Sequence, residues 1–414
     1  MIGAGYMERI SIALFTAPGI AGRVSANLID NLPGMLEYYI TDEYEWYVDY
    51  QEDILTGGTN DSYKVIEAVS DKKDQGDWDY AIALTDLPVF EDEKPVVAEA
   101  LRDKNVGFIS LPGFGFTKME KRVQEAILQL VNEIYYGTSD SSREEAQEYI
   151  DSKDPQKYDA LRNKGSRELI GGRLFERFSP LIRERPIEED AGVAVRYTVK
   201  SRMSGMLRII SGMVFANEPW KMFPSFLKIL IIAFTTGSYA LVFPTLWKLS
   251  DEYSVIRLFL LMCAAILALV GWIIMAHQLW EKKDENNNKF IRKMNNASTF
   301  FTLLLTVMMY YVLLLILFLA TTFMLVPPSG LETQLSRDIA IFDFLIIAWT
   351  AASISTLIGG LGSAFEDEQV VLDSTYGYRQ RQRHEKIKKQ REKEKEKEKA
   401  QREEYEGEDE DENN

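Results

Sequence analysis

The chain has little of the chemistry on which most catalytic and metal sites depend. Its 414 residues include one cysteine and two histidines. The single cysteine, Cys263, excludes an intramolecular disulfide and a thiolate metal cluster. Both histidines, His277 and His384, lie beyond roughly the first 200 residues, so that part of the chain cannot use histidine as an acid or base. We predict no metal site and assign no cofactor.

Positive charge is also scarce. The formal net charge is −16, and acidic residues crowd the C-terminus. An acidic protein repels phosphates at long range, which excludes general nucleic-acid binding. The N-terminus lacks the basic segment, apolar run and cleavage site of a secretory signal peptide. We therefore expect the first domain to stay in the cytosol.

Long apolar runs are present between residues 223 and 365. Four of them approach or exceed the ~20 residues that a helix needs to cross ~30 Å of hydrocarbon. They are apolar on every side, as lipid-facing helices are. Ionisable side chains lie only near their ends, which disfavours a transport pathway. We predict a bundle of four transmembrane helices, at about 226–246, 255–277, 300–326 and 339–361.

Lysine and arginine in the loops predict the orientation, because cytosolic loops carry the excess of these residues. The first and third loops hold only Lys248 and Arg337. The second loop holds five basic residues: Lys282, Lys283, Lys289, Arg292 and Lys293. We therefore expect this loop on the cytosolic side of a cell membrane. With an even number of spans, both termini are expected in the cytosol as well.

An amphipathic segment precedes the first span. Its apolar residues fall on one helical face, outside which lie Arg202 and Arg208. The members of this stripe are Met203, Met206, Leu207, Ile210, Met213 and Val214. We predict an amphipathic helix over residues 201–222 that lies at the inner headgroup level of the bilayer. The alternative is a soluble helix packed on the first domain.

The fourth span carries small residues four positions apart. They share one helical face and allow another helix to approach closely. The residues are Ala351, Ser355, Gly359 and Ser363. This face serves either packing within the bundle or a homo-oligomer.

The N-terminal domain alternates predicted strands and helices. The strands are expected at residues 9–15, 45–49, 78–84 and 106–110, and the helices at 23–32, 63–72 and 118–136. Such alternation is typical of an α/β domain with a mostly parallel, Rossmann-like sheet. We place this domain at residues 1–137. The polar segment 138–200 is expected to be a connector with short helices.

In a sheet of this type, ligands bind beyond the carboxyl ends of the strands. The loops there are rich in glycine, hydroxyl groups and single charges, which suit a small anion or a nucleotide at a helix N-terminus. The candidate ligand-binding residues are Thr16, Gly19, Gly22, Arg23, Thr56, Gly57, Gly58, Thr59, Thr85 and Asp86. The alternative is that these residues only form the turns between strands and helices.

Stronger catalytic signatures are missing from this domain. There is no phosphate-binding loop with the Walker pattern, no nucleophile elbow and no His-Glu-x-x-His motif. Gly3 and Gly5 precede the first predicted strand and so do not form a dinucleotide fingerprint. Asp53 and Asp86 remain as carboxylates for acid–base or metal chemistry, or as loop and capping residues.

Three segments resemble a family of uncharacterised multi-pass membrane proteins of Gram-positive bacteria, and the likeness covers all but the tail. They are residues 205–220, His277-Gln278-Leu279-Trp280-Glu281 and Thr85-Asp86-Leu87-Pro88. Some members carry the label methylene-tetrahydrofolate dehydrogenase. That label implies a nicotinamide-dependent folate enzyme with a glycine-rich fingerprint and a Tyr-x-x-x-Lys arrangement, neither of which is assigned in the first domain. The resemblance therefore indicates location and architecture.

The tail, residues 366–414, is charged throughout. A basic patch between Arg379 and Lys389 precedes alternating Glu and Lys and an acidic end. We expect disorder there. The basic patch either contacts anionic lipid or is simply solvated.

Two functions are compatible with this sequence. In the first, the cytosolic domain binds a small ligand or a protein partner and passes that state to the helices, or acts as a scaffold. The alternative is a membrane-tethered enzyme that acts on a phosphorylated or folate-like metabolite.

Overall fold

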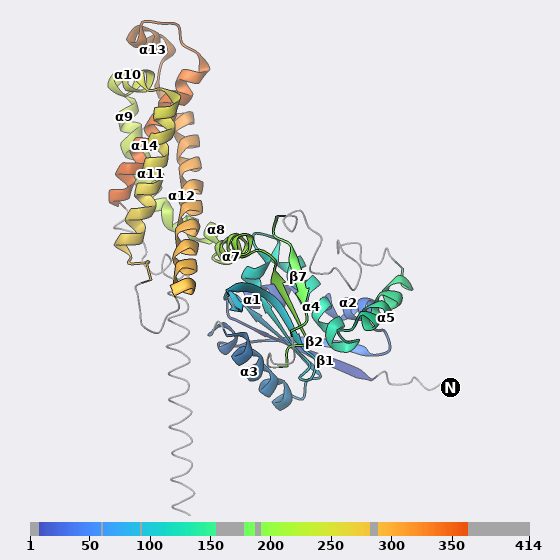
Figure 1. Ribbon diagram of the computed structural model, residues 1–414. Helices are drawn as coiled ribbons and strands as arrows, with labels where there is room; N and C mark the ends of the chain where they lie inside the picture. Colours follow the sequence, from blue (N-terminus) through green and yellow to red (C-terminus); the bar gives the residue numbers. More distant parts are fainter. Residues whose placement is uncertain are drawn as a thin grey trace, which may run out of the picture. The chain divides into compact units, whose positions relative to one another are not determined.

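A computed structural model of the chain describes residues 8–58, 61–91, 93–154, 178–186, 192–281 and 289–362. It contains two compact units, described separately below (Figure 1). The α/β unit extends to Ala216, and the helical unit begins at Asn217. Thr59, Ser363 and the whole predicted tail lie outside the described residues.

The α/β unit is built on one sheet of eight strands. The strands are β1 (Arg9–Thr16), β2 (Glu45–Glu52), β3 (Tyr80–Thr85), β4 (Val89–Glu91), β5 (Lys94–Leu101), β6 (Val106–Ser110), β7 (Leu181–Glu184) and β8 (Val195–Val199). Their order is β2-β1-β3-β6-β5-β8-β7, and β4 pairs with β5. The four strands predicted from the sequence are β1, β2, β3 and β6, and all four are confirmed.

The prediction of a mostly parallel sheet is not confirmed, because the sheet is mixed. Strands β2, β1, β3 and β6 are parallel neighbours. Strands β4, β5, β8 and β7 extend the sheet through antiparallel pairings. In the parallel part, β1 is central between β2 and β3.

Helices cover both faces of the sheet. They are α1 (Ile20–Leu28), α2 (Leu32–Tyr39), α3 (Ser62–Gln75), α4 (Met119–Tyr135), α5 (Asp140–Asp151) and α7 (Arg202–Ala216), with the short turns η1 (Leu55–Gly57) and η2 (Leu111–Phe114). On one face α3 packs Val65 and Val69 against Phe15 and Phe108. On the other face α4 lies over Gly107, where an added Cβ would be 3.0 Å from Leu130.

The predicted connector at 138–200 is wrong in part, because β7 and β8 belong to the sheet. A buried carboxylate helps to hold them there. Glu133 of α4 is 0 % exposed. It accepts hydrogen bonds from Arg183 Nε of β7 (2.8 Å), Tyr197 Oη of β8 (2.8 Å) and Gln129 Nε2 (3.1 Å). The first compact unit therefore extends to Ala216, beyond the predicted boundary at residue 137.

Within the described residues, four helical segments are long and apolar enough to cross a membrane: Arg202–Leu241, Val255–Ala276, Lys289–Leu325 and Ile341–Ile358. The first begins with α7 of the α/β unit, and the other three lie wholly in the helical unit. Its elements are α8 (Pro219–Met222), η3 (Phe223–Phe226), α9 (Leu227–Leu241), α10 (Pro244–Glu252), α11 (Val255–Ala276), α12 (Lys289–Leu325), α13 (Pro328–Leu335) and α14 (Ile341–Gly362). The first predicted span ends early at Leu241, since Pro244 has no N–H to continue the helix.

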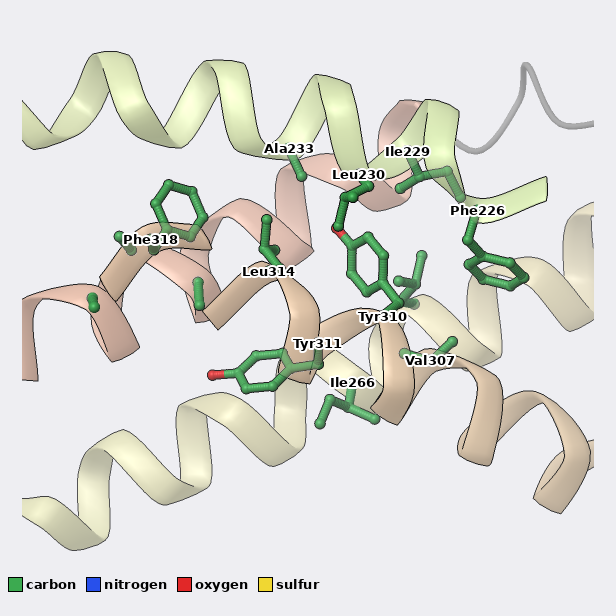
Figure 2. Packing of buried hydrophobic residues seen from close by; sticks show 14 of the residues in the cluster. Phe226, Ile229, Leu230, Ala233, Ile266, Val307, Tyr310, Tyr311, Leu314 and Phe318 are labelled. Carbon is green, nitrogen blue, oxygen red and sulfur yellow. The ribbon is translucent and has the colours of Figure 1, made fainter. Parts of the chain in front are cut away.

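The four long helices pack on one another around buried apolar and aromatic side chains (Figure 2). Tyr310 and Leu314 of α12 belong to the same buried cluster as Phe226, Leu230 and Ile266. All five are at most 8 % exposed. The core of this unit is therefore made by residues of α9, α11, α12 and α14 with the preceding η3.

Two members of the small-residue face are buried inside this unit. Ala351 and Ser355 are 2 % and 1 % exposed. Ser355 lies so close to α9 that an added Cβ on Gly237 would be 2.1 Å from its Oγ. Packing within the unit accounts for both residues. The side chains of Gly359 and Ser363 are outside the described part, and an oligomer through this face stays a prediction.

Candidate functional site

The parallel strands bring several predicted site residues to one edge of the sheet. From β1 the chain runs to β2 on one side, and from β2 it crosses to β3 on the other. The strand order therefore reverses between β1 and β3, and such switch points are where α/β proteins bind ligands. Two backbone hydrogen bonds of 2.8 Å join the loops there, from Asp53 N to Thr16 O and from Ala17 N to Leu84 O.

The three loops that end β1, β2 and β3 converge. The turn η1 contacts both β1 and β3. Thr16, Thr56 and Thr85 are fully buried, and Asp86 is 1 % exposed. The backbone positions Gly57 and Gly58 are buried too, whereas Arg23 is exposed.

Asp53 holds the η1 turn in place. Its Oδ2 accepts from Thr56 Oγ1 (3.0 Å), and its Oδ1 accepts from Leu55 N (3.2 Å). Lys72 Nζ of α3 lies 2.7 Å from the same Oδ1. The Asp53 carboxylate therefore stabilises the loop, which agrees with its interpretation as a loop or capping residue. Lys72 is a cation at this edge that the sequence did not reveal.

Hydrogen bonds from side chains to the backbone also hold the loop after β3 in place. Leu87 N donates to Thr85 Oγ1 (3.2 Å), and Ser110 Oγ of β6 donates to Leu87 O (2.8 Å). Thr85 and Ser110 are both fully buried. These hydrogen bonds hold the loop in place beside the site. The Thr85 hydroxyl already accepts a hydrogen bond from a backbone N–H of the same loop.

The start of α1 is the least satisfied part of this edge. Its N-cap is Gly19, with φ 107°, and no side chain caps the helix among the described residues. Thr16 Oγ1, three residues earlier, is buried without a hydrogen-bond partner in the described part of the chain. Ala13 and Phe15 face α3, so Thr16 points to the opposite face, where α1 and α4 lie.

Glu52, the last residue of β2, completes this corner. It is the register partner of Thr16 and so shares its face of the sheet. Its Oε1 lies so close to α1 that a Cβ added to Gly22 would be 2.5 Å away. A Cβ at position 22 would require the exposed Glu52 side chain to move away. Glu52 is not among the site residues predicted from the sequence, although it is an acidic residue shortly after the second predicted strand.

This corner offers two kinds of recognition side by side. The first N–H groups of α1, apart from that of Gly22, which donates to Ala17 O (3.2 Å), attract a phosphate or another anion, as does the positive end of the α1 dipole. An exposed carboxylate such as Glu52 accepts hydrogen bonds from hydroxyl groups. A ligand that carries both groups, such as a nucleotide or a sugar phosphate, matches this pair.

No group of three or more His, Cys, Asp or Glu side chains suited to a metal ion occurs within the described residues. The reactive groups at this edge are therefore hydroxyls, carboxylates and cations: Thr16, Thr56, Thr85, Glu52, Asp53, Asp86, Arg23 and Lys72.

A Tyr-x-x-x-Lys spacing, which the folate label requires, occurs at Tyr149 and Lys153, and the sequence analysis overlooked it. Tyr149 Oη donates to Glu37 O (2.9 Å) and Asp42 Oδ1 (3.1 Å), and Lys153 Nζ donates to Asp42 Oδ2 (2.7 Å). The hydrogen bond from Lys153 lowers the pKa of Asp42. Asp42 precedes β2, which begins at Glu45, so this cluster lies at the amino edge of the parallel strands, away from the candidate site.

Comparison with known proteins finds no family model, no curated protein and no solved structure that matches this chain.

Proposed function

We propose that this protein is a membrane-anchored receptor whose α/β unit binds a small phosphate-bearing ligand, a nucleotide, beyond the carboxyl ends of β1, β2 and β3. The observation that carries the proposal is the corner formed by the uncapped N-terminus of α1, the buried hydroxyl of Thr16 and the carboxylate of Glu52. The membrane anchor rests on four helices of sufficient length and apolarity.

The phosphate end of the ligand belongs at the start of α1. A buried hydroxyl without a partner costs about 1–3 kcal/mol, and a ligand oxygen beside Thr16 removes that cost. The backbone N–H groups after Gly19 supply further donors. Because Glu52 repels phosphate, the hydroxyl groups of the ligand occupy the side toward β2, as a ribose would.

Binding rather than catalysis is supported by the way the polar groups are used. Asp53 is engaged by Thr56 and Lys72, and Thr85 by Leu87. These residues shape the loops and do not present a proton donor or acceptor to a ligand. Asp86, 1 % exposed beside the same loops, is the observation that favours the alternative, a tethered enzyme for a phosphorylated or folate-like metabolite.

The test is equilibrium binding of ADP, NAD, NADP, folate and inorganic diphosphate to the full-length protein in lipid nanodiscs. We expect Thr16→Val to weaken every phosphate-bearing ligand. Glu52→Gln should weaken the nucleotide roughly tenfold, about 1.4 kcal/mol, and leave diphosphate unchanged. Glu67→Gln, an exposed position on α3, is the matched control.

Two results would count against the proposal. One is the absence of binding by all five compounds, and the other is binding that neither Thr16→Val nor Glu52→Gln alters. Conversion of a bound compound to a product, lost in Asp86→Asn, would establish the enzyme alternative instead.

We further propose the orientation that the basic residues predict, with both termini in the cytosol. Reporter tags at residue 1 and after residue 414 should then report the cytosol, and one near Gly330 the outside. A tag at residue 1 that external protease removes from wall-stripped cells would contradict this orientation.

A further inference from the structure

Helix α7 exposes large apolar side chains and buries an arginine, which is the reverse of what is usual for a helix of a soluble domain. Arg208 is fully buried, whereas Met203 and Leu207 are 78 % and 68 % exposed. A soluble helix normally buries its apolar stripe and exposes its arginine. Met203 and Leu207 both belong to the stripe that the sequence identified, so its N-terminal part is exposed, whereas Met213 and Val214 at its C-terminal end are buried.

Specific contacts fix α7 in this orientation. Arg208 donates to Ser179 O (2.6 Å), to Ser179 Oγ (3.2 Å) and to Gly113 O (3.3 Å). Gly205 and Gly212 lie against Pro95 and Pro112, where an added Cβ would be 2.9 Å and 2.2 Å from the neighbouring atoms. The outward face is therefore a consequence of close packing on the opposite side, and the helix cannot roll to hide Met203.

Aromatic residues extend the exposed face at both ends of α7. Phe178 is 79 % exposed and adjoins Ser179, whose Oγ lies 3.3 Å from Ser204 O. Phe116 is 52 % exposed and packs edge-to-face on Phe215 of α7, with ring centroids 5.2 Å apart. We define the α7 face as Met203, Leu207, Phe116 and Phe178.

We propose that the α7 face docks on the inner leaflet of the membrane that holds the helical unit, and sits at the boundary between headgroups and acyl chains. This goes beyond the proposed ligand site and does not depend on it. The surface would hold the α/β unit against the bilayer in a defined orientation.

The length of chain between the units supports lipid as the occupant. Only ten residues, or eleven residue-to-residue steps, separate Ala216 from Leu227, where α9 begins, and most of these residues are helical. At 1.5 Å per residue they reach about 17 Å, and even a fully extended segment reaches about 37 Å. The end of α7 is thus tied close to the first apolar helix, and lipid is the apolar surface always available there.

The charge of this segment supports the same occupant. Residues 200–228 contain five basic residues and one acidic residue, a local net charge of +4 in a chain of net charge −16. Basic residues beside an apolar helical face favour binding to anionic lipid headgroups. The basic residues are Lys200, Arg202, Arg208, Lys221 and Lys228. Arg208 takes part in the packing described above, Arg202 is paired with Glu93, and Lys221 is paired with Glu218.

The test uses spin labels on the full-length protein in vesicles that contain phosphatidylglycerol. Since Cys263 is the only cysteine, a Cys263→Ala background allows single labels at Met203→Cys and, as a control, at Glu67→Cys on α3. The Met203 label should be accessible to oxygen and shielded from an aqueous nickel chelate, and the Glu67 label the reverse. Adding Leu207→Asp and Phe178→Asp should shift the Met203 label toward water.

Two outcomes would overturn the proposal. A Met203 label as open to the nickel chelate as the Glu67 label would show that the α7 face lies in water. Shielding of the Met203 label from both reagents would show a protein contact, such as a second copy of this chain. Met203, Leu207, Phe178 and Glu67 are exposed, and Cys263→Ala removes one sulfur atom from a partly buried position, so loss of folding is not an expected cause of either result.

Discussion

The position of the domain boundary can be tested by cutting the chain at two places. A fragment of residues 1–216 keeps β7 and β8, and a fragment of residues 1–137 removes both. In the shorter fragment β5 becomes an edge strand, with unpaired N–H and C=O groups that invite aggregation. We expect the longer fragment to fold alone and the shorter one to be unfolded or insoluble.

The expected magnitude follows from two buried carboxylates. Glu133 loses Arg183, whose NH2 lies 2.6 Å from its Oε2, and Glu99 loses Arg196, whose Nε lies 2.5 Å from its Oε1. Both glutamates are 0 % exposed. Breaking a buried pair costs about 3–5 kcal/mol, and two such losses are comparable to the whole stability of a domain, about 5–15 kcal/mol.

Point variants in the longer fragment separate the ion pair from the loss of strands. Glu133→Ala should lower the free energy of unfolding by about 3–5 kcal/mol, because it leaves the Arg183 side chain, which is only 15 % exposed, without its counter-charge. Glu133→Leu combined with Arg183→Met should recover much of that loss. The control is Glu184→Ala, whose partner Lys94 is 3.7 Å away and half exposed, with a change below about 1 kcal/mol.

The assay is urea unfolding followed by circular dichroism, with the free energy obtained by linear extrapolation. If the fragment of residues 1–137 unfolds cooperatively with the stability of the longer fragment, β7 and β8 are not part of the folding unit. If Glu133→Ala and Glu184→Ala have equal effects, the buried hydrogen bonds of Glu133 contribute nothing beyond a surface pair.

Two further predictions concern packing and pH. Gly212→Val places side-chain atoms where a Cβ alone would be 2.2 Å from Pro112 O, so we expect a loss of about 1–3 kcal/mol or more in urea unfolding, against little change in Ser211→Ala. Burial raises the pKa of Tyr80 to about 12. The stability that this tyrosine contributes is therefore complete below its unfolded pKa of about 10. It is lost as the pH rises toward 12, and the loss is about 2 kcal/mol. Tyr80→Phe should flatten this part of the alkaline unfolding curve, and an unchanged curve would refute the assignment.

Local patterns in the sequence determined much of the architecture. Apolar runs long enough for the bilayer mark the four long helices, because a lipid-facing helix is apolar on every side. Strands β1, β2, β3 and β6 were predictable, because they are apolar or β-branched runs bounded by turn residues. The convergence of Thr16, Thr56 and Thr85 followed from the alternation of strands and helices.

Tertiary structure decided the rest, since it depends on contacts between distant residues. Strands β7 and β8 are short and lie in a polar segment, and they become strands only by pairing with each other and with β5. Glu52 and Lys72 reach the candidate site because the register of β2 and the packing of α3 carry them there. The face of α7 that is buried is set by Gly205, Arg208 and Gly212. Their contacts with the α/β unit outweigh the tendency of the apolar stripe to be buried.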